Sequence, residues 1–550
     1  MMMNRLRKAG IAIGALLLLL LLSCGAGEVT PTIVVDSMAD TDSRDGVVTL
    51  REAILLATGE LAVTDLDSGE ADNVGKRPGP DSRDTITFNA SVFQPPEGGT
   101  IPLTGPLPGL STGADSVDAS QAGVIVEGGQ LTFECLTIDS AGNLIKGLQI
   151  QNCLVGIMIK AGAGSNVIGG SAPGEGNVIS DNDEGIVIAG AGADNNAIKG
   201  NFIGVDPTAS SALPNRNGVD IREEARGNVV GGSEPGERNV ISGNKGVGVT
   251  IAGNANLVLG NYIGTDRSGT SGIPNGMEGI WIAPGAQDNI IGGSSAGERN
   301  VISGNDLFGL SISGSGATGN RVQGNYVGID ATGTRPLPNA HGVVVTDGPL
   351  DNVIGGAEPG QGNVISGNDT GVLIRGSNTS ENTLLGNYIG TDAAGSEMFP
   401  NARGIWLLEG ANHNTIGGTG PGEGNVISGN NLSGVDVEGP NTVGNTIRGN
   451  SIYANQGKGI DNAGNGNGGL EPPVITSVSP IAGVACTGCT VDIYSDSSDQ
   501  GEIYEGSAVA DADGAFIFEA APSGPNITAT ATDGDGNTSV FAQPVPVAAG

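Results

Sequence analysis

Basic residues are scarce in this chain of 550 residues. Lys and Arg together number 24 against 59 Asp and Glu, so the formal net charge is −35 at pH 7. Nucleic acids and anionic bilayer surfaces attract proteins through basic patches. The charge therefore argues against nucleic acid or a bilayer surface as a partner. It suits a soluble extracellular surface, and calcium is the one cofactor that such an acidic surface suggests.

Aromatic residues are also few. They make up 3% of the chain, although hydrophobic residues reach 37% and glycine accounts for 97 residues. A core with so few large rings has to be built from Val, Ile and Leu in thin layers. This composition is what a parallel β-solenoid requires.

The apolar run from Ile11 to Leu22 is too short to span a membrane, which takes roughly 20 residues. Three basic residues precede it, as in an export signal. The segment Leu21–Gly25 resembles the lipobox of bacterial lipoproteins, which implies cleavage before Cys24 and lipidation of its thiol. The alternative is an ordinary signal peptide with an incidental cysteine. In both cases we expect an exported chain, and the lipid would be its only attachment to the membrane of the cell envelope, with the protein facing outside.

The five cysteines are at positions 24, 135, 153, 486 and 489. If Cys24 carries lipid, an even number remains in an oxidising compartment, which favours disulfides. Cys486 and Cys489 are close enough to join in a small hairpin. Cys135 and Cys153 either pair across neighbouring coils or are small buried hydrophobic residues. A zinc site is disfavoured because the two histidines of the chain lie far away in sequence.

The middle of the chain is a repeat of about 31 residues. Each unit holds two asparagines and then a Gly-apolar-x-apolar strand such as Gly371–Ile374. The first asparagines are at 166, 196, 228, 256, 289, 320, 352, 382, 414 and 445, and the second at 177, 201, 239, 261, 300, 325, 363, 387, 425 and 450. Three short strands per unit, repeated about ten times, indicate a solenoid. The strand-sized runs and the scarcity of leucine exclude helical and leucine-rich repeats.

The repeated residue types fit stacked coils. Identical side chains then form ladders at a spacing of roughly 4.8 Å, in which asparagine can hydrogen-bond to the next asparagine and adopt the left-handed backbone of a corner. Val and Ile fill the interior. Loops alternate, with a Pro-Gly-Glu type such as Pro421–Glu423 in odd coils. Even coils carry a longer loop that opens with Asn-aromatic-Ile-Gly-x-Asp.

We therefore predict an all-β protein, a right-handed parallel β-helix with an N-terminal capping helix and a small C-terminal β-sandwich. A Thr49–Glu52 capping box begins the helix, which continues to Ala57. The expected parts are the signal peptide (1–23), an N-terminal strand, capping helix and acidic insertion (24–83), the β-helix (84–461), a flexible Gly/Asn linker (462–473) and an Ig-like sandwich (474–550).

The segment 46–54, GVVTLREAI, resembles the CSLREA segment that precedes many bacterial right-handed β-helix proteins. Val48 and Thr49 stand where that pattern has Cys and Ser. The repeats resemble the pectin-lyase-like superfold, and the C-terminal part resembles bacterial Ig-like modules. That superfold includes pectate lyases, polygalacturonases, phage tailspikes and adhesins, so the resemblance implies a fold and no single function.

No catalytic residue is predicted. Pectate lyases of this superfold combine a calcium-binding carboxylate cluster with a catalytic Arg. Polygalacturonases use several Asp residues with a His and an Arg-Lys motif. We find no counterpart to either set. His341 and His413 occupy different coil positions without neighbouring acid–base partners, and we interpret them as surface residues.

Four aspartates, Asp206, Asp266, Asp330 and Asp392, stand at equivalent positions of successive even coils. Neighbours lie two coils apart, roughly 10 Å, which is too far for the tight carboxylate pair of a retaining glycosidase. A catalytic centre would also interrupt the repeat once, whereas these residues follow it. We interpret them as Asx turns within the long loops, with weak cation binding as the alternative.

The x position of the third strand should point outward, because its two neighbours point inward. Both tryptophans of the chain occupy this column, and Trp281, Val344, Leu373 and Trp406 make an apolar stripe about 19 Å long at the stacking repeat. Such a stripe is a candidate for docking a glycan or a protein. Alternatively the long loops, including Met398–Phe399, fold over it.

The sequence thus favours an exported, lipid-anchored surface protein that acts in adhesion or in glycan or protein binding without catalysis. Its partner would be a polysaccharide or a cell-surface protein. One alternative is a polysaccharide lyase or glycoside hydrolase with an unfamiliar active site. Another is a passive structural spacer of the envelope.

Overall fold

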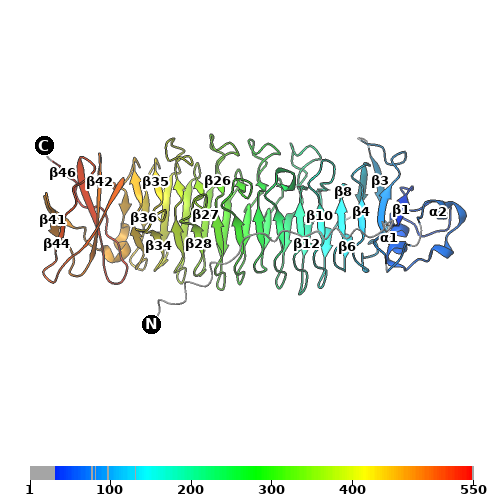
Figure 1. The fold of residues 1–550 in the computed structure, drawn as a ribbon, viewed down its shortest axis with the longest axis horizontal. Coiled ribbons are helices and arrows are strands. Elements are labelled where there is room, and N and C mark those ends of the chain that lie inside the picture. Colours follow the sequence, from blue (N-terminus) through cyan, green and yellow to red (C-terminus); the bar gives the residue numbers. More distant parts are fainter. Residues whose placement is uncertain (1–30, 76–77, 81, 96–97, 130–131, 548–550) are drawn as a thin grey trace, which may run out of the picture.

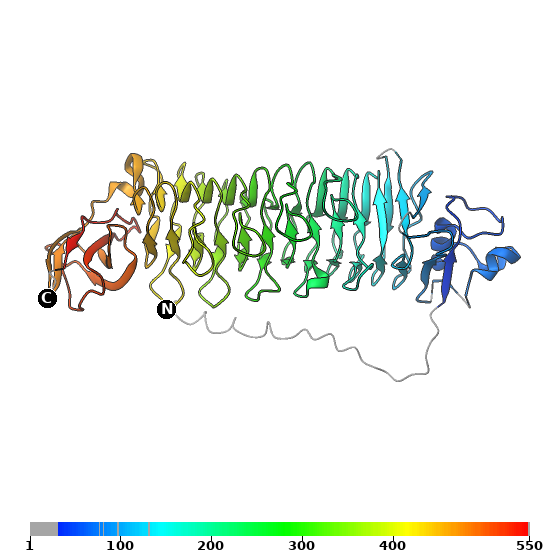
Figure 2. The same ribbon diagram turned by 90° about the horizontal axis from the view of Figure 1, so that it is seen from above.

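The computed structural model describes residues 31–547 except 76–77, 81, 96–97 and 130–131. The chain forms a long rod in which three parallel sheets run along the length, with a helix at one end and a small antiparallel region at the other (Figure 1, Figure 2). The predicted parallel β-helix is confirmed. The signal peptide and Cys24 lie outside the described residues. Within them, no helix is both long and apolar enough to cross a bilayer.

Each complete coil contributes one strand to each sheet, and the first coils lack a strand of the third sheet. The strands of the first sheet are, in spatial order, β1 (Thr32–Val35), β2 (Thr85–Phe88), β4 (Ser116–Asp118), β7 (Leu144–Lys146), β10 (Val167–Gly169), β13 (Ala197–Lys199), β16 (Val229–Gly231), β19 (Leu257–Leu259), β22 (Ile290–Gly292), β25 (Arg321–Gln323), β28 (Val353–Gly355), β31 (Thr383–Leu385), β34 (Thr415–Gly417) and β37 (Thr446–Arg448). The strand expected in the N-terminal part (24–83) is therefore β1, and it is the first strand of the solenoid, ahead of residue 84.

The second and third sheets follow the same order. The strands of the second are β3 (Gly99–Pro102), β5 (Val124–Glu127), β8 (Leu148–Gln151), β11 (Val178–Ile179), β14 (Phe202–Ile203), β17 (Val240–Ile241), β20 (Tyr262–Ile263), β23 (Val301–Ile302), β26 (Tyr326–Val327), β29 (Val364–Ile365), β32 (Tyr388–Ile389), β35 (Val426–Ser428) and β38 (Ser451–Tyr453). The strands of the third are β6 (Glu134–Ile138), β9 (Val155–Ile159), β12 (Glu184–Ile188), β15 (Asn217–Ile221), β18 (Val249–Ile251), β21 (Ile280–Ile282), β24 (Phe308–Ser313), β27 (His341–Thr346), β30 (Thr370–Arg375), β33 (Arg403–Leu408), β36 (Val435–Val437) and β39 (Ile460–Asp461).

Buried asparagines form three ladders, each just before the strands of one sheet. Asn320 shows the pattern: its backbone N–H and Nδ2 donate to Asn352 Oδ1 at 3.0 and 2.9 Å, and its own Oδ1 accepts the same pair from Asn289. The sequence predicted the first two ladders. The third, at 182, 215, 244, 275, 305, 339, 368, 401, 430 and 455, was missed although its asparagines recur at similar spacing.

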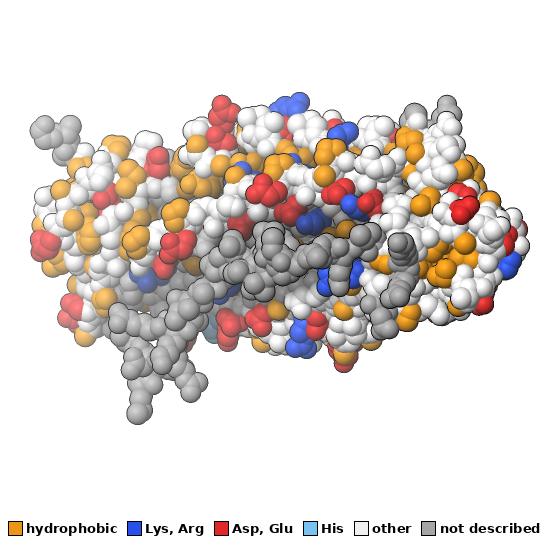
Figure 3. Space-filling view, turned by 45° about the vertical axis from the view of Figure 1, so that its right-hand side comes forward, with side chains coloured by type: hydrophobic (Ala, Val, Ile, Leu, Met, Phe, Trp, Pro, Cys, Tyr) orange, Lys and Arg blue, Asp and Glu red, His pale blue; other side chains and the backbone are white. Residues whose placement is uncertain are grey.

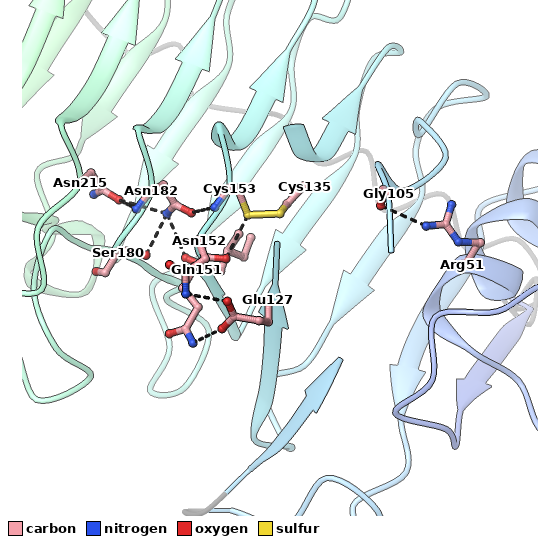
Figure 4. Close-up of a disulfide and its surroundings, with 11 residues drawn as sticks. Arg51, Gly105, Glu127, Cys135, Gln151, Asn152, Cys153, Ser180, Asn182 and Asn215 are labelled. Atoms are coloured by element: carbon pink, nitrogen blue, oxygen red, sulfur yellow. Dashed lines mark hydrogen bonds between the residues drawn. A yellow bond between two sulfur atoms is a disulfide. The ribbon is translucent and has the colours of Figure 1, made fainter. Parts of the chain in front are cut away.

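The third ladder begins at a disulfide. Cys153 N–H donates to Asn182 Oδ1 at 3.0 Å, so Cys153 takes the place of an asparagine in the first coil of the ladder (Figure 4). Its sulfur is bonded to Cys135 of β6, across a Cα–Cα distance of 5.7 Å. The structure thus has these cysteines paired across neighbouring coils. Cys486 and Cys489 are bonded to each other in the C-terminal region.

A helix covers the first coils. α1 (Leu50–Thr58) starts with the predicted Thr49–Glu52 capping box, and its apolar side is buried in the solenoid core. Arg51 donates to the carbonyls of Pro106 and Gly105 at 2.8 and 3.1 Å, which ties the helix to the solenoid. The insertion after it contains η1 (Val63–Asp65) and α2 (Ser68–Asp72). A further short helix, η2 (Pro235–Glu237), lies in a loop of the solenoid.

The opposite end is closed by the C-terminal region. Its two antiparallel sheets contain β40 (Val474–Val478), β41 (Ile481–Val484) and β44 (Ala515–Phe518), and β43 (Ile503–Val509), β42 (Thr490–Asp496), β45 (Asn526–Thr532) and β46 (Val545–Pro546). Asn455, the last of the third ladder, donates its N–H and Nδ2 to Gln500 Oε1 at 2.9 and 3.2 Å. Arg448 pairs with buried Asp492 at 2.7 Å.

The expected linker is part of this closure. It contains η3 (Ala463–Gly469), in which Asn467 is buried and accepts the backbone N–H of Asn445 at 3.0 Å. Asn467 also donates to the carbonyl of Thr538 at 3.1 Å. The Asp533–Asn537 turn uses Asn537 Oδ1 to accept the N–H of Gly444 at 2.6 Å. These contacts join the linker and the turn to the last coil.

Replacing one ladder asparagine should cost much of the stability. Asn320→Ala leaves the backbone N–H of Asn289 without an acceptor inside the rod and removes one of the two bonds that Asn289 Nδ2 donates, the other going to the carbonyl of Gly253. We expect a loss of about 2–4 kcal/mol. Chemical denaturation followed by circular dichroism measures it. Asn431→Ala, at an exposed position where Oδ1 accepts only from Gln456, is the matched control and should change stability by less than about 0.5 kcal/mol. Equal effects of the two variants would contradict the ladder as a main source of stability.

The first ladder starts with acids, which makes its N-terminal end sensitive to pH. Asp115 is fully buried, accepts the N–H of Asp84 at 3.1 Å and donates its own to Asn143 Oδ1. Burial, with a smaller effect of Asp84, raises the pKa of Asp115 to about 6. The folded state therefore binds more protons than the unfolded state between about pH 4 and 6, and its stability falls as the pH rises through this range.

Asp115→Asn should remove this loss. We expect a gain of about 1–2 kcal/mol at pH 7 and a flatter stability profile between pH 4 and 6, since an amide continues the ladder without a charge. Denaturation at several pH values measures both. Asp118→Asn, which removes the ion pair with Lys146, is the matched change and should not stabilise the protein. A destabilised Asp115→Asn protein would contradict the assignment.

Candidate binding surface on the third sheet

The tryptophan column lies on the outer face of the third sheet in the expected register. The parallel pairing places Trp281 beside Ser311, then Val344, Leu373 and Trp406 in successive coils. The neighbours within each strand, such as Ile280 and Ile282, are fully buried in the core. Four steps of the stacking repeat separate the two tryptophans, about 19 Å.

Both indoles are half-buried and held in place by hydrogen bonds. Trp281 Nε1 donates to Ser313 Oγ at 2.7 Å, and Trp406 Nε1 donates to Glu438 Oε2 at 3.0 Å. Each partner belongs to the following coil, so both rings lean in the same direction along the rod. Fixed rings of this kind are suited to stacking on a flat apolar partner.

Charged side chains surround Trp406. The guanidinium carbon of Arg403 lies 4.4 Å from the ring centroid, a cation–π contact, and Arg403 also pairs with Asp436 at 3.3 Å. Burial raises the pKa of Asp436, and the nearby charges of Asp461 and Glu438 act in the same direction, while Arg403 opposes them. The C-terminal end of the column thus combines an aromatic ring with polar groups.

The positions between the tryptophans are less exposed than the sequence suggested. Val344 is fully buried and Leu373 is 4% exposed, so the accessible apolar surface of the column comes from the two indoles. Larger side chains flank these buried positions of the column within the same strands. Phe308 and His341 lie on one side with ring centroids 5.5 Å apart, and on the other Arg375 Nε donates to Thr346 Oγ1 at 3.2 Å.

His341 is half-buried on this face, although the sequence suggested a simple surface residue. Burial lowers the pKa of its imidazole. Its buried Nδ1 has no hydrogen-bond partner among the described residues.

The long loops do not cover the tryptophan column. Phe399 packs beside Tyr326, Tyr388 and Val364, which lie on the second sheet. Met398 pairs with Thr391 across its own loop and is 51% exposed. The aromatic residues of the Asn-aromatic-Ile-Gly-x-Asp motif therefore form a second outer column, at every other coil of the second sheet, and this is the column that the loops shield.

The four repeated aspartates organise these loops. Asp206 Oδ1 accepts the backbone N–H groups of Ser210 and Ser211 at 2.9 and 3.1 Å, and Asp392 does the same for the equivalent residues of its loop. These are Asx-type bonds, in which a side chain closes its own turn. Among the described ranges, no three His, Cys, Asp or Glu side chains gather in a way that could hold a metal.

An acid–arginine cluster lies nearer the N-terminus of the third sheet, and the sequence did not reveal it. Arg216 pairs with Asp183 at 2.7 Å and also contacts Glu184, which is 6% exposed. Burial raises the pKa of Glu184, opposed by Arg216. Glu278 and Asp369 stand at the positions of Glu184 and Asp183 in later coils, but the combination of both acids with an arginine in the adjacent coil does not recur. A search for acids and arginines at equivalent third-strand positions of adjacent coils would have found them.

The charges on the surface are mixed. On the face seen in Figure 3, acidic and basic side chains alternate with apolar ones, without a continuous basic patch on the residues shown in colour.

No protein-family model matches this sequence, and a comparison with curated proteins finds no match. Among solved structures, the Dettilon tailspike protein is similar over 81% of this chain and 74% of its own, at 17% identity and a TM-score of 0.41. The enzymatically active domain of bacteriophage CBA120 tailspike protein 2 is similar over 84% of this chain and 66% of its own, at 11% identity and a TM-score of 0.31. At this level of similarity we draw no conclusion about function from either protein.

Proposed function

We propose that this chain is an exported, lipid-anchored surface protein that binds a glycan on the outer face of the third sheet and acts in adhesion without turnover. The observation that carries the proposal is the placement of the two tryptophans. They are the only tryptophans in the sequence, they stand in one column, and their rings are oriented by hydrogen bonds. Structural needs of the solenoid do not explain them, because the other coils manage with smaller or charged residues at this position.

A glycan fits this surface better than a protein partner does. The pyranose ring presents apolar C–H faces that stack on indoles and hydroxyls that bond to polar neighbours. Here each indole has polar or charged side chains close by, such as Ser313 at Trp281 and Arg403, Asp436 and Glu438 at Trp406. A protein interface of standard size has instead a contiguous apolar centre, and buried Val344 and Leu373 interrupt the apolar surface between the indoles.

A second function has an observation in its favour. The Arg216, Asp183 and Glu184 cluster brings a buried acid and an arginine together on the same face, which is the arrangement expected of a glycoside hydrolase or lyase. The cluster lies several coils from Trp281, so a long chain would be needed to contact both.

The binding proposal predicts that the two tryptophans act together. A glycan array identifies a ligand, and calorimetry should then show that Trp281→Ala or Trp406→Ala weakens binding by about tenfold and that the double variant abolishes it. Ile517→Ala, an exposed apolar residue of the C-terminal region, is the control and should bind normally.

Two results would contradict this prediction. Unchanged binding by the double variant would favour a passive spacer. Release of reducing ends from the same glycan, lost in Glu184→Gln, would show turnover and favour the hydrolase.

The anchor has its own test. Export of the full chain with labelled palmitate in a bacterial host should label the protein and place it in the detergent phase, and Cys24→Ser should abolish both. Cys489→Ser is the matched control, because that cysteine lies far from the lipobox-like segment. Labelling that survives Cys24→Ser would contradict the lipid anchor and leave an ordinary signal peptide.

A further inference from the structure

A pocket of about 550 Å³ lies over the outer face of the second sheet, whereas the tryptophan column lies on the third sheet. Its floor includes Val178, Phe202 and Val240. Two Pro-Gly turns of odd coils, at Gly174 and Gly236, form one wall, and the long loops of even coils supply Pro207 and Arg267 on the other side. A volume of this size is typical of sites for small ligands.

The pocket is open here because each long loop packs against the long loop before it, and the first long loop has none before it. Arg267 N–H donates to the carbonyl of Ala209 in the preceding loop, and Ala331 N–H donates to Gly269 in the same way. The first long loop, 206–211, has no counterpart two coils earlier, because the coil from Asn143 to Asn166 has only 23 residues and carries no such loop. Phe202 therefore lies at the uncovered end of the aromatic column, whereas Tyr326 further along is only 9% exposed.

Two arginines give this pocket a positive charge in a strongly acidic protein. Arg238 donates Nε–H to the carbonyl of Gly260 at 2.9 Å, and its guanidinium carbon lies 4.2 Å from the centroid of the Tyr262 ring. This contact fixes the plane of the guanidinium and leaves its terminal nitrogens available. Arg267 is exposed and lies 5.9 Å from the ring centroid of Phe202.

Neither arginine forms an ion pair with a carboxylate of the described residues. That is notable where acids outnumber bases by 59 to 24. Other arginines, such as Arg216, Arg335 and Arg403, do pair with acids. The pocket thus holds two guanidinium groups that can neutralise an incoming anion.

We propose that this pocket binds a saccharide unit that carries one anionic group, either a carboxylate or a sulfate ester. The guanidinium groups of Arg238 and Arg267 bind the anion through charge-assisted hydrogen bonds, which are stronger than neutral ones. The ring of Phe202 supplies an apolar contact for the sugar. Gly174 and Gly236 let the two wall turns stack closely on the chain before them, because a Cβ would collide with the backbone carbonyl of Ser120 or Ser171.

Calorimetry with three oligosaccharide probes and one salt tests the proposal. The probes are trigalacturonate, its neutral methyl ester and a sulfated disaccharide, and inorganic sulfate is titrated at the same ionic strength. We expect at least one anionic saccharide to bind, the neutral ester to bind at least tenfold more weakly, and Arg238→Gln or Arg267→Gln to weaken binding about tenfold. Preference between the two acidic probes identifies the anionic group.

Arg299→Gln is the matched control. Arg299 stacks on Tyr326 at 4.1 Å and donates to Gly324 at 3.1 Å. These contacts repeat those of Arg238 two coils further along the rod, but Arg299 does not line the pocket. Its variant should bind like the wild type. The Trp281→Ala/Trp406→Ala protein should also retain this binding, so the two proposals can fail separately.

Three results would overturn the proposal. These are wild-type affinity in both pocket variants, equal affinity for the acid and its methyl ester, and affinity for inorganic sulfate as high as for the saccharides. The last would identify an adventitious ion only.

Discussion

Each buried asparagine of the solenoid makes its hydrogen bonds with the asparagine of the next coil, and the rest of the structure depends on this contact. A corner of a parallel coil leaves backbone groups inside the rod without strand partners, and such groups are costly to bury. An amide side chain both donates and accepts, so one residue type repeated in register satisfies the corner above and the corner below. Since the amides require alignment, they also fix the register of all three sheets and therefore which residue of each strand faces outward.

Much of the fold could be predicted from the sequence because the asparagines of the ladders recur at regular intervals. The spacing of the first and second asparagines identified the coils, and the Gly-apolar-x-apolar strand predicted the outward column that contains Trp281. The third ladder was missed although its spacing also repeats. Asn182 and its equivalents are harder to recognise because they stand in varied contexts, such as Ser-Asp-Asn182 and Leu-Pro-Asn215.

The ends and the exposure of single residues could not be predicted in this way. Cys153 stands at a ladder position without an amide side chain, and Gln500 supplies an amide that reaches its partner Asn455 from another part of the chain. The burial of Val344 depends on neighbours in adjacent coils, which a single repeat does not contain. The pocket near Phe202 exists because the long loop is missing from the coil two turns earlier, and a pattern of recurring residues gives little indication of a missing one.

The closed ends have a consequence for how the length of such a protein can change. Asn467 and Gln500 at one end and Asp84 with Cys153 at the other each match one particular terminal coil, so coils cannot be added outside them. Coils can be added only in the interior, where asparagine meets asparagine. Because the two loop types alternate, an insertion that preserves loop stacking comprises two coils, and the rod would grow in steps of about 10 Å. The length of the rod can therefore change only in two-coil steps, while the structures at its two ends stay the same.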